Sequence, residues 1–163
     1  MRDFPHTLKI ATVWGLLGVA LFLAVQFWQT RAERARFATA TDGAIEIRRG
    51  PDGHYHWPGR VNGVEVEFLV DTGASATALP VAIAERAGLR ADGSVTSSTA
   101  GGTVRGMLAR ADIELAGGVR AERLRVAVLP DLAAPLLGMD VLSQLHFSQS
   151  GGVLRLTPRP AAQ

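Results

Sequence analysis

A single acid stands at the end of an apolar run in the segment FLVDTGASATALP, residues 68–80. The acid is Asp71, and Thr72 and Gly73 follow it at once, so its carboxylate is placed where the chain turns sharply. Carboxyl groups that work in pairs can share one proton, because two of them cannot both ionise at close range. One member then accepts a proton while the other donates one. That chemistry needs two carboxyl groups, whereas this motif supplies one.

The other acid to consider for such a pair is Asp140, in the downstream segment PLLGMDVL. Asp140 lacks the Thr-Gly sequence that follows Asp71, and it stands where the N-cap of a helix is expected. The pattern therefore favours a helix cap over a second catalytic acid within the same chain. A second carboxyl group would then have to come from another copy of the chain.

Two histidines, His54 and His56, are two residues apart on a predicted strand and would share a face. No further histidine or acid stands at a recognisable ligand spacing from them, so we expect no metal site and no cofactor. The chain has no cysteine, which excludes disulfides, thiol catalysis and thiolate metal ligands. We expect the adjacent Tyr55 and Trp57 to pack or to lie on a hairpin surface rather than to form a substrate platform.

The excess positive charge lies in the N-terminal part of the chain. The formal net charge is +2 and the sequence pI is about 9.9, yet residues 41–163 contain 12 Arg against 13 Asp plus Glu. Binding to nucleic acid requires a concentrated basic face, which this distribution does not provide. We therefore expect no nucleic-acid partner.

Residues 10–30, IATVWGLLGVALFLAVQFWQT, contain no charged residue. At ~1.5 Å per residue this segment approaches the roughly 30 Å hydrocarbon core of a bilayer, which predicts a transmembrane helix. A cleaved signal peptide is the alternative, but its apolar region is normally shorter, at ~7 to 15 residues, and the A-x-A sequence at residues 38–40 lies too far downstream. Residues 1–9 would form an N-terminal tail and residues 31–43 a linker.

The membrane orientation does not follow from the charges that flank this segment. Positive charge marks the cytoplasmic side of a membrane helix. Here the α-amino group and two basic residues precede the segment and three basic residues follow it: Arg2, Lys9, Arg31, Arg34 and Arg36. The two sides are therefore equal.

Residues 44–158 are predicted to form a small, mainly β domain, with a tail at residues 159–163. Apolar and polar residues alternate in the first part of this domain, and Asp52-Gly53 and Asn62-Gly63 stand where two hairpins would turn. Many short strands with one or two short helices are typical of a small barrel or closed sandwich. A parallel α/β fold would need longer and more regular helices.

Turn residues divide the rest of this domain. Pro80 at a first helical position and Gly88 as a stop predict a short helix. Residues 97–102 are rich in Ser, Thr and Gly, which predicts a mobile loop or hairpin tip. Further strands are predicted at residues 104–115, 121–130 and 153–158, and a strand end running into a short helix at residues 135–145.

The segment VDTGA after an apolar strand, followed in order by PLLGMDVL, resembles the retropepsin-like aspartic proteases of clan AA. Specifically, it resembles the membrane-anchored, single-domain bacterial group of that clan. The resemblance covers residues 45–156 and implies a closed acid-protease barrel, mainly β, preceded by a transmembrane helix. It also implies an aspartic endopeptidase, in which two Asp residues activate the water that hydrolyses the peptide bond.

Because each chain would supply one catalytic residue, Asp71, the resemblance implies a symmetric homodimer acting on polypeptide. The resemblance also implies three groups of supporting residues. Thr72, Gly73, Ala74 and Ser75 would support the active-site loop, and the Thr72 hydroxyl would connect the two loops of the dimer from beneath. Leu136, Leu137 and Gly138 would form a structural element under the site, and Ala100, Gly101 and Gly102 would form a flap. The protein would be a single-pass inner-membrane protein with its catalytic domain in the periplasm.

Two other functions fit the sequence. A non-catalytic peptide-binding or scaffolding module on the same fold would explain the anchor and a cleft, although it has no need of a paired carboxylate. The other alternative is a monomeric assembly or interaction domain, in which the Asp71 carboxylate only accepts hydrogen bonds from loop N–H groups. The mode of dimerisation is open as well, because viral retropepsins interleave their chain termini, whereas this domain lies between a membrane helix and the short tail RPAAQ.

Overall fold

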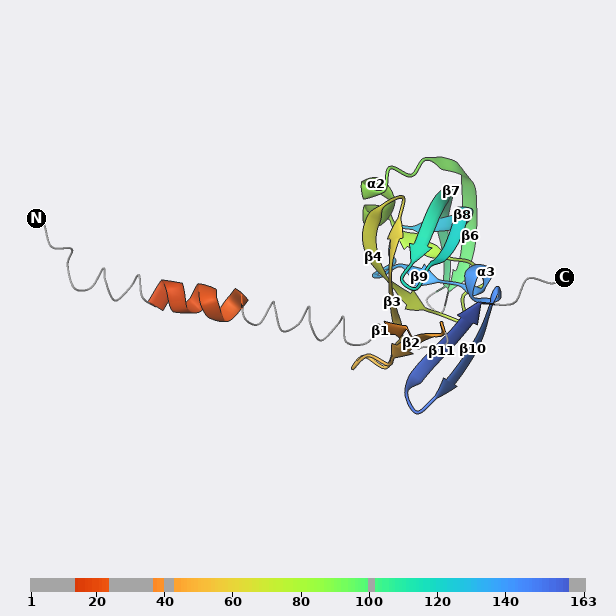
Figure 1. The fold of residues 1–163 in the computed structure, drawn as a ribbon. Coiled ribbons are helices and arrows are strands. Elements are labelled where there is room, and N and C mark those ends of the chain that lie inside the picture. Colours follow the sequence, from red (N-terminus) through yellow and green to blue (C-terminus); the bar gives the residue numbers. More distant parts are fainter. Residues whose placement is uncertain (1–13, 24–36, 40–42, 100–101, 159–163) are drawn as a thin grey trace, which may run out of the picture. The chain divides into compact units, whose positions relative to one another are not determined.

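The computed structural model describes residues 14–23, 37–39, 43–99 and 102–158 (Figure 1). The chain divides into two compact units, Met1–Arg36 and Phe37–Gln163. In the first unit residues 14–23 are helical. Within the described ranges no helix is long and apolar enough to cross a membrane. The remainder of the span predicted at residues 10–30 lies outside those ranges.

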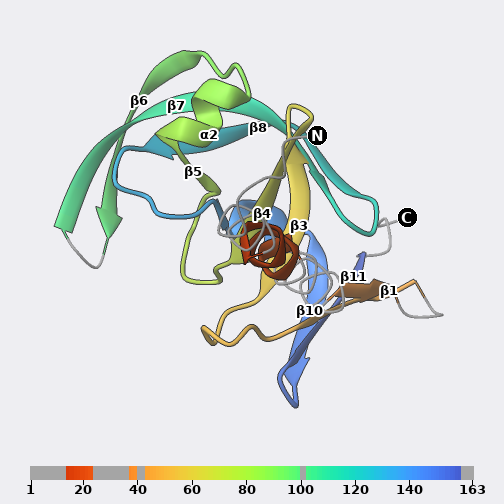
Figure 2. The ribbon, with the colours of Figure 1, turned by 90° about the vertical axis from the view of Figure 1, so that its left-hand side faces the viewer.

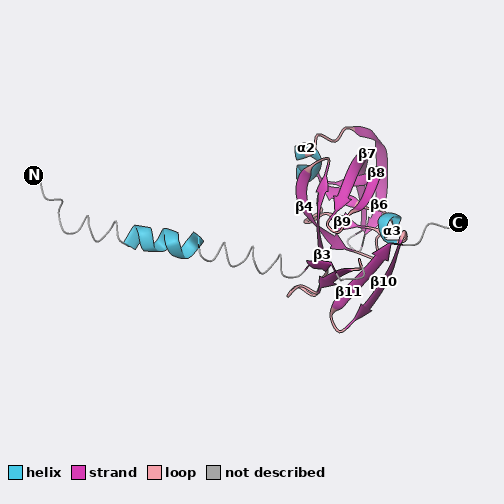
Figure 3. Cartoon of the chain, in the orientation of Figure 1, coloured by secondary structure: helices cyan, strands magenta, loops and turns pink. Residues whose placement is uncertain are grey.

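The second unit is built almost entirely from strands (Figure 3). Its strands are β1 (Phe37–Thr39), β2 (Ile45–Arg48), β3 (His56–Val61), β4 (Val64–Val70), β5 (Ala78–Pro80), β6 (Ala91–Thr99), β7 (Gly102–Leu115), β8 (Val119–Leu129), β9 (Leu136–Leu137), β10 (Leu145–Ser150) and β11 (Val153–Pro158). Its helices are α2 (Val81–Arg86) and α3 (Met139–Leu142). The strands form two sheets, with the orders β1-β2-β11-β10 and β3-β4-β9-β5-β8-β7-β6.

The larger sheet closes into a barrel. Strand β3 pairs with β4 on one side and with β7 on the other, so β3, β4, β9, β5, β8 and β7 form a ring, and β6 extends from β7 outside it (Figure 2). The prediction of a small, closed, mainly β barrel with short helices is confirmed. Fully buried apolar side chains form its core, among them Trp57, Phe68 and Leu137. The Trp57 indole N–H donates to the Ala116 carbonyl at 2.8 Å, which confirms its packing role.

The barrel closes next to the β3–β4 hairpin, which turns at Asn62-Gly63 as predicted. Both residues have positive φ, 47° and 83°, as the two central residues of a type I′ turn require. The Asn62 side chain donates to the Ala87 carbonyl at 3.1 Å and accepts from the Asp112 N–H at 2.9 Å. It therefore ties the hairpin to the end of α2 and to β7, beside the pairing that closes the ring.

The prediction of a hairpin at Asp52-Gly53 is wrong in part. A turn does form there, since the Gly50 N–H donates to the His54 carbonyl at 2.7 Å. The strands on either side nevertheless belong to different sheets and share only the single bridge between Arg49 and Tyr55. Strand β2 pairs instead with β11, where its apolar residues Ile45 and Ile47 are buried opposite the buried residues Leu156 and Leu154. Burial of this apolar surface favours the long-range pairing over the local hairpin.

Three further details differ from the sequence-based expectations. Strand β1 lies within the predicted linker at residues 31–43 and pairs with β2. Helix α2 begins at Val81, so Pro80 is its N-cap rather than its first helical residue. Strand β10 was not expected, because apolar and polar residues alternate in its sequence, LHFSQS, over only four residues; in the structure its first residue alone is buried.

Candidate active site

The Asp71 loop begins where strand β4 ends. The Asp71 N–H donates to the Leu137 carbonyl at 3.1 Å, which fixes the backbone of the acid against β9. The Asp71 carboxylate is half-buried, and its Oδ1 accepts the Gly73 N–H at 2.8 Å. The Ala74 N–H donates to the Asp71 carbonyl at 3.3 Å and closes the turn. The loop therefore orients one carboxylate oxygen with a backbone donor and leaves the group accessible.

The Leu136-Leu137-Gly138 segment lies against this loop. Strand β9 runs parallel to β4, with Leu137 beside Val70, and antiparallel to β5. The Met139 N–H donates to the Ala74 carbonyl at 2.8 Å, from just beyond the segment. At Gly138 the backbones are so close that a Cβ atom would lie 2.5 Å from the Ala76 carbonyl carbon. Only glycine fits there without moving the loop.

Asp140 forms hydrogen bonds with Thr77, near the C-terminal end of the Asp71 loop. Its carboxylate accepts the Thr77 N–H at 2.9 Å and the Thr77 hydroxyl at 2.8 Å, while the same hydroxyl accepts the Gly138 N–H at 3.2 Å. Thr77 is fully buried, and it is the one buried polar residue among the described residues. The N-cap position of α3 is Gly138, without a side-chain cap, so the prediction that Asp140 caps the helix is wrong. The carboxylate accepts two donors of Thr77 on the neighbouring loop, and its Oδ1 also accepts the Val141 N–H of α3 at 3.0 Å.

Sequence reasoning missed Thr77. Its hydroxyl lies in a run, SATAL, that carries no sign of a buried hydrogen bond. The partner Asp140 is far away in the sequence and was assigned to a local cap. A local preference was therefore outweighed by the cost of leaving buried polar groups unpaired, about 1 to 3 kcal/mol each.

Thr72 and Ser75 differ from Thr77 in burial. Both are exposed, and within the described part of the chain neither side chain makes a hydrogen bond. Ala74 between them is half-buried. The loop thus presents an exposed hydroxyl directly beside Asp71.

The predicted flap is the tip of the β6–β7 hairpin. The last pair of this hairpin is Thr99 with Gly102, and Ala100 and Gly101 lie outside the described residues. Further down the hairpin, Val95 and Val104 pack against a small cluster that also holds the β9 residue Leu136. The other members of that cluster are Ala78, Ala127, Leu129 and Leu132. The hairpin therefore packs on strands that also carry the Asp71 loop.

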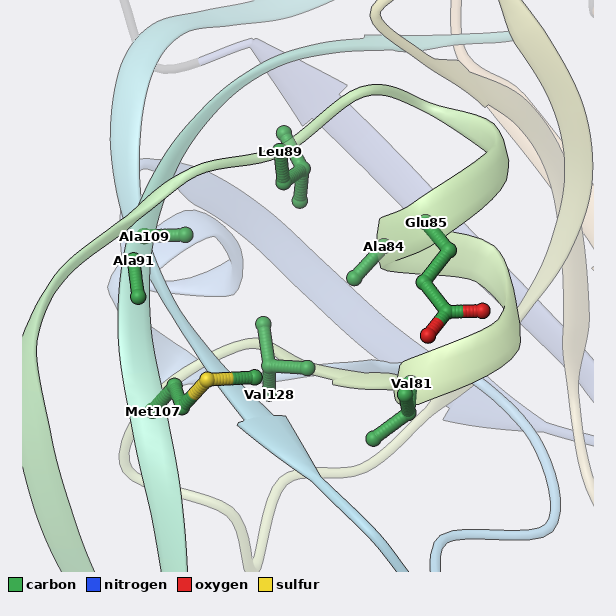
Figure 4. A pocket seen from close by; sticks show the side chains of 8 residues that line it. All are labelled: Val81, Ala84, Glu85, Leu89, Ala91, Met107, Ala109 and Val128. Atoms are coloured by element: carbon green, nitrogen blue, oxygen red, sulfur yellow. The ribbon is translucent and has the colours of Figure 1, made fainter.

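A second feature of the domain is an apolar pocket away from this loop (Figure 4). It is lined by side chains from α2, from the segment that follows it and from strands β6, β7 and β8: Val81, Ala84, Glu85, Leu89, Ala91, Met107, Ala109 and Val128. Glu85 is its one charged residue. None of these residues belongs to the Asp71 loop or to the segment beneath it.

Of the two histidines considered as ligands, His54 lies in the turn before β3 and His56 is the first residue of β3. The His56 ring lies between two carboxylates, with Nε2 2.7 Å from Asp52 Oδ2 and Nδ1 3.4 Å from Glu67 Oε2. The hydrogen bond from His56 lowers the pKa of Asp52 below its ordinary value of 3.8. The His54 N–H also donates to Asp52 at 3.2 Å. In the part of the chain that the structure describes, no three His, Cys, Asp or Glu side chains are grouped to hold a metal ion.

Comparison with known proteins identifies relatives with this fold. The model of the family described as "gag-polyprotein putative aspartyl protease" matches residues 57–144, which include Asp71 and Gly138. The chain is similar to the crystal structure of a retropepsin-like aspartic protease from Rickettsia conorii, with 28% identity and a TM-score of 0.55, covering 69% of this chain and 89% of that chain.

A more distant likeness is to the EIAV protease complexed with the inhibitor HBY-793. That protein has 22% identity and a TM-score of 0.51, covering 60% of this chain and 92% of its own, which is a likeness of fold. No curated protein sequence matches the chain.

Proposed function

Because this chain belongs to the gag-polyprotein aspartyl protease family and has a retropepsin-like fold, we propose that it is a membrane-anchored aspartic endopeptidase that acts as a homodimer. The observation that carries the proposal is the Asp71 carboxylate, half-buried and oriented by the Gly73 N–H at 2.8 Å. The loop that holds it is fixed by three hydrogen bonds to neighbouring residues. The Leu137 carbonyl accepts from the Asp71 N–H, the Gly138 N–H donates to the Thr77 hydroxyl, and the Met139 N–H donates to the Ala74 carbonyl. A single such carboxylate per chain calls for a second chain.

In the proposed dimer the two Asp71 carboxyl groups face each other and share one proton. The ionised carboxylate accepts a proton from water as the water attacks the peptide carbonyl, and the protonated one donates to the carbonyl oxygen. In this proposal the Thr72 hydroxyl of each chain, which is exposed in the single chain, contacts the loop of its partner. An extended peptide would lie between the protomers, held by β-type hydrogen bonds from the β6–β7 hairpin.

The proposal places the protein in the inner membrane as a single-pass protein, with the protease domain in the periplasm. Its support is the uncharged segment at residues 10–30. Within the helix at residues 14–23, large apolar side chains are exposed, including Trp14 at 70% and Phe22 at 62%. Exposed apolar surface of this extent is typical of contact with lipid or another apolar partner.

The test is cleavage of a denatured protein mixture from about pH 3 to pH 8 by the full chain in detergent. The wild-type chain is expected to cleave, with activity rising toward acidic pH, where the pair holds its single proton. Asp71→Asn is expected to abolish cleavage with its fold intact, because amides cannot take the two proton-transfer roles. Asp131→Asn, at an exposed acid outside the site, is the matched control and should cleave like wild type.

Two results would contradict the proposal. Unchanged cleavage by the Asp71→Asn chain would remove this carboxylate from the mechanism. Binding of extended peptide by the wild-type chain with no turnover at any pH would instead indicate the non-catalytic peptide-binding module.

A further inference from the structure

Two arginines, which we call the arginine pair, lie directly opposite each other on neighbouring strands of the larger sheet. Arg110 of β7 is the register partner of Arg125 of β8, and both side chains are exposed. Figure 2 shows β6, β7 and β8 side by side, in the order that the sheet topology gives. Like charges directly opposite each other destabilise a sheet. This placement is therefore unfavourable unless negative charge lies close by.

The described part of the chain supplies one carboxylate for these two guanidinium groups. The Arg110 Nε–H donates to Asp92 Oδ2 at 2.9 Å, and Asp92 is the extra residue at the bulge of β6. The neighbouring acid of β7, Asp112, accepts the Arg123 N–H at 2.7 Å instead. Among the described residues, the other nitrogens of Arg110 and all those of Arg125 have no acceptor. The arginine pair therefore keeps most of its donors free for another anion.

The two guanidinium groups approach each other at the bulge of β6. A Cβ atom at Gly93, directly after Asp92, would lie 3.9 Å from Arg125 Nη2, so the Arg125 side chain extends from β8 across β7. The Arg110 guanidinium is held at Asp92 itself. Their free N–H groups thus lie close together on an exposed surface. Arginine donors in this arrangement fit the two oxygens of a carboxylate, which guanidinium groups bind in a bidentate manner.

The face of the sheet that carries the arginine pair continues toward the Asp71 loop. Alternate residues of a strand share a face, so Arg125 lies on the same face of β8 as Ala127 and Leu129. Ala127 and Leu129 belong to the small apolar cluster that also holds Leu136 of β9, the strand against which the Asp71 backbone is fixed. The four residue steps from Leu129 to Arg125 span about 13 Å at ~3.3 Å per residue. A short stretch of extended peptide covers that distance.

We propose that Arg110 and Arg125 bind an acidic side chain of the polypeptide substrate, a few residues from the bond that is cleaved. This inference rests on the proposed function, since it names a feature of the substrate that the Asp71 site would hydrolyse. The ligand is the carboxylate of a Glu or Asp residue, in an extended segment that runs along this face from the small apolar cluster to the arginine pair. Its negative charge offsets the repulsion between the two arginines. A neutral residue in its place leaves that repulsion standing.

The first test measures binding without cleavage, on the full Asp71→Asn chain in detergent. The probes are short extended peptides that carry a single Glu, moved one position at a time, and the same peptides with Gln. At one or two adjacent positions we expect the Glu peptide to bind about threefold to tenfold more tightly than its Gln counterpart. This preference should weaken at high salt, because the arginine pair is exposed. Equal binding of Glu and Gln peptides at every position, or no binding at all, would overturn the proposal.

Variants of β8 assign the preference to the arginine pair. On the same background Arg125→Gln should remove the preference for Glu, whereas Arg125→Lys should keep part of it, because lysine retains the charge but not the planar fork. Arg120→Gln is the matched control, since Arg120 is an exposed arginine of the same strand that already has an acidic partner, Glu114, at 3.9 Å. The control should prefer Glu as its parent does. Loss of the preference in the control as well would contradict a role specific to the arginine pair.

Urea unfolding of the same chains separates binding from support of the fold. Arg125→Gln should unfold at the same urea concentration as its parent or at a higher one, because the substitution removes a like-charge pair. A variant that unfolds more easily and loses the preference for Glu would show that Arg125 stabilises the sheet, and would overturn its assignment as a binding residue.

The same peptides, given to the wild-type chain, distinguish this inference from the proposed function. A preference for Glu both in binding and in kcat/KM supports the arginine site and the protease. A preference for Glu in binding, with no cleavage of any peptide, supports the arginine site and contradicts the protease. Cleavage that is equally fast for Glu and Gln peptides at every position overturns the arginine site and leaves the protease standing.

Discussion

Thr72 and Thr77 carry the same side chain in opposite surroundings. Thr77 is fully buried, and its hydroxyl connects the Gly138 N–H to the Asp140 carboxylate. Thr72 is exposed beside Asp71, and within the described residues its hydroxyl has no hydrogen bond. One hydroxyl therefore stabilises the domain itself, and we propose that the other acts only when a second chain is present.

Replacing each threonine by valine tests this contrast. Thr77→Val should lower the free energy of unfolding by about 2 to 4 kcal/mol, because a buried N–H and a carboxylate oxygen each lose a partner. Thr72→Val should leave it within about 0.5 kcal/mol of wild type, as an exposed site does. Urea unfolding measures both at low protein concentration, where dimerisation adds little stability. Equal losses for the two variants would show that the hydrogen bonds at Thr77 are not what stabilises the loop.

Gly73 and Gly138 give a second contrast at the residue scale. A Cβ at Gly73 would lie 3.1 Å from Asp71 Oδ1, and a side chain can yield by a few tenths of an ångström. A Cβ at Gly138 would meet the backbone of Ala76 and Thr77, which cannot yield without moving the loop. We therefore expect Gly73→Ala to lower kcat about tenfold to a hundredfold with a stability loss under about 1 kcal/mol.

Gly138→Ala should instead cost about 3 kcal/mol or more in unfolding free energy, because the overpacking is between backbones. Unfolding curves and initial cleavage rates on the same two chains separate the effects. A Gly73→Ala chain with wild-type kcat would show that the position of this carboxylate oxygen does not limit the reaction.

The elements that sequence reasoning predicted are those whose cause is local. The Asn62-Gly63 turn, the strand before Asp71 and the barrel hairpins follow from residue types at adjacent positions. The predictions that were wrong concern contacts between residues far apart in the sequence. Strand β2 pairs with β11 from the other end of the domain, and Asp140 binds Thr77 across the loop. Neither partner could be chosen from local propensity, because burial across the whole fold decides between them.

The turn between β2 and β3 provides a pH test at the scale of an element. Asp52 anchors this turn to His56 of β3, and Glu67 of β4 faces the other ring nitrogen. Because the hydrogen bond from His56 lowers the pKa of Asp52 below 3.8, the pair stabilises the fold above that pH. The stabilisation is lost as the pH falls through the lowered pKa of Asp52 in the folded protein.

Asp52→Asn should therefore unfold more easily than wild type between about pH 5 and pH 7, and the difference should shrink below the ordinary carboxyl pKa of 3.8. Urea midpoints of residues 37–163 across this range measure it, with Asp131→Asn as the exposed control. A difference that grows as the pH falls would contradict the assigned direction of the pKa.

At the scale of the whole molecule, each domain carries one Asp71 loop, so the proposed activity depends on how often two domains meet. The strand pairing of the second unit starts at Phe37, and a fragment of residues 37–163 keeps β1 on β2. Such a fragment moves in three dimensions. A chain anchored by residues 10–30 would be confined to a plane in one orientation, which raises the effective concentration of its partner.

Dilution distinguishes these two situations. At chain concentrations already well below the dimer Kd, a further tenfold dilution of the fragment should lower its cleavage rate per chain about tenfold. In that range the dimer fraction is proportional to the chain concentration. The full chain in lipid vesicles should keep its rate per chain when the vesicles are diluted, since the surface density of chains is unchanged. The Asp71→Asn chain in the same vesicles gives the background. An equal fall on dilution for both preparations would show that the N-terminal segment does not confine the protease to a membrane, whereas no fall for either would mean that the domains assemble tightly without it.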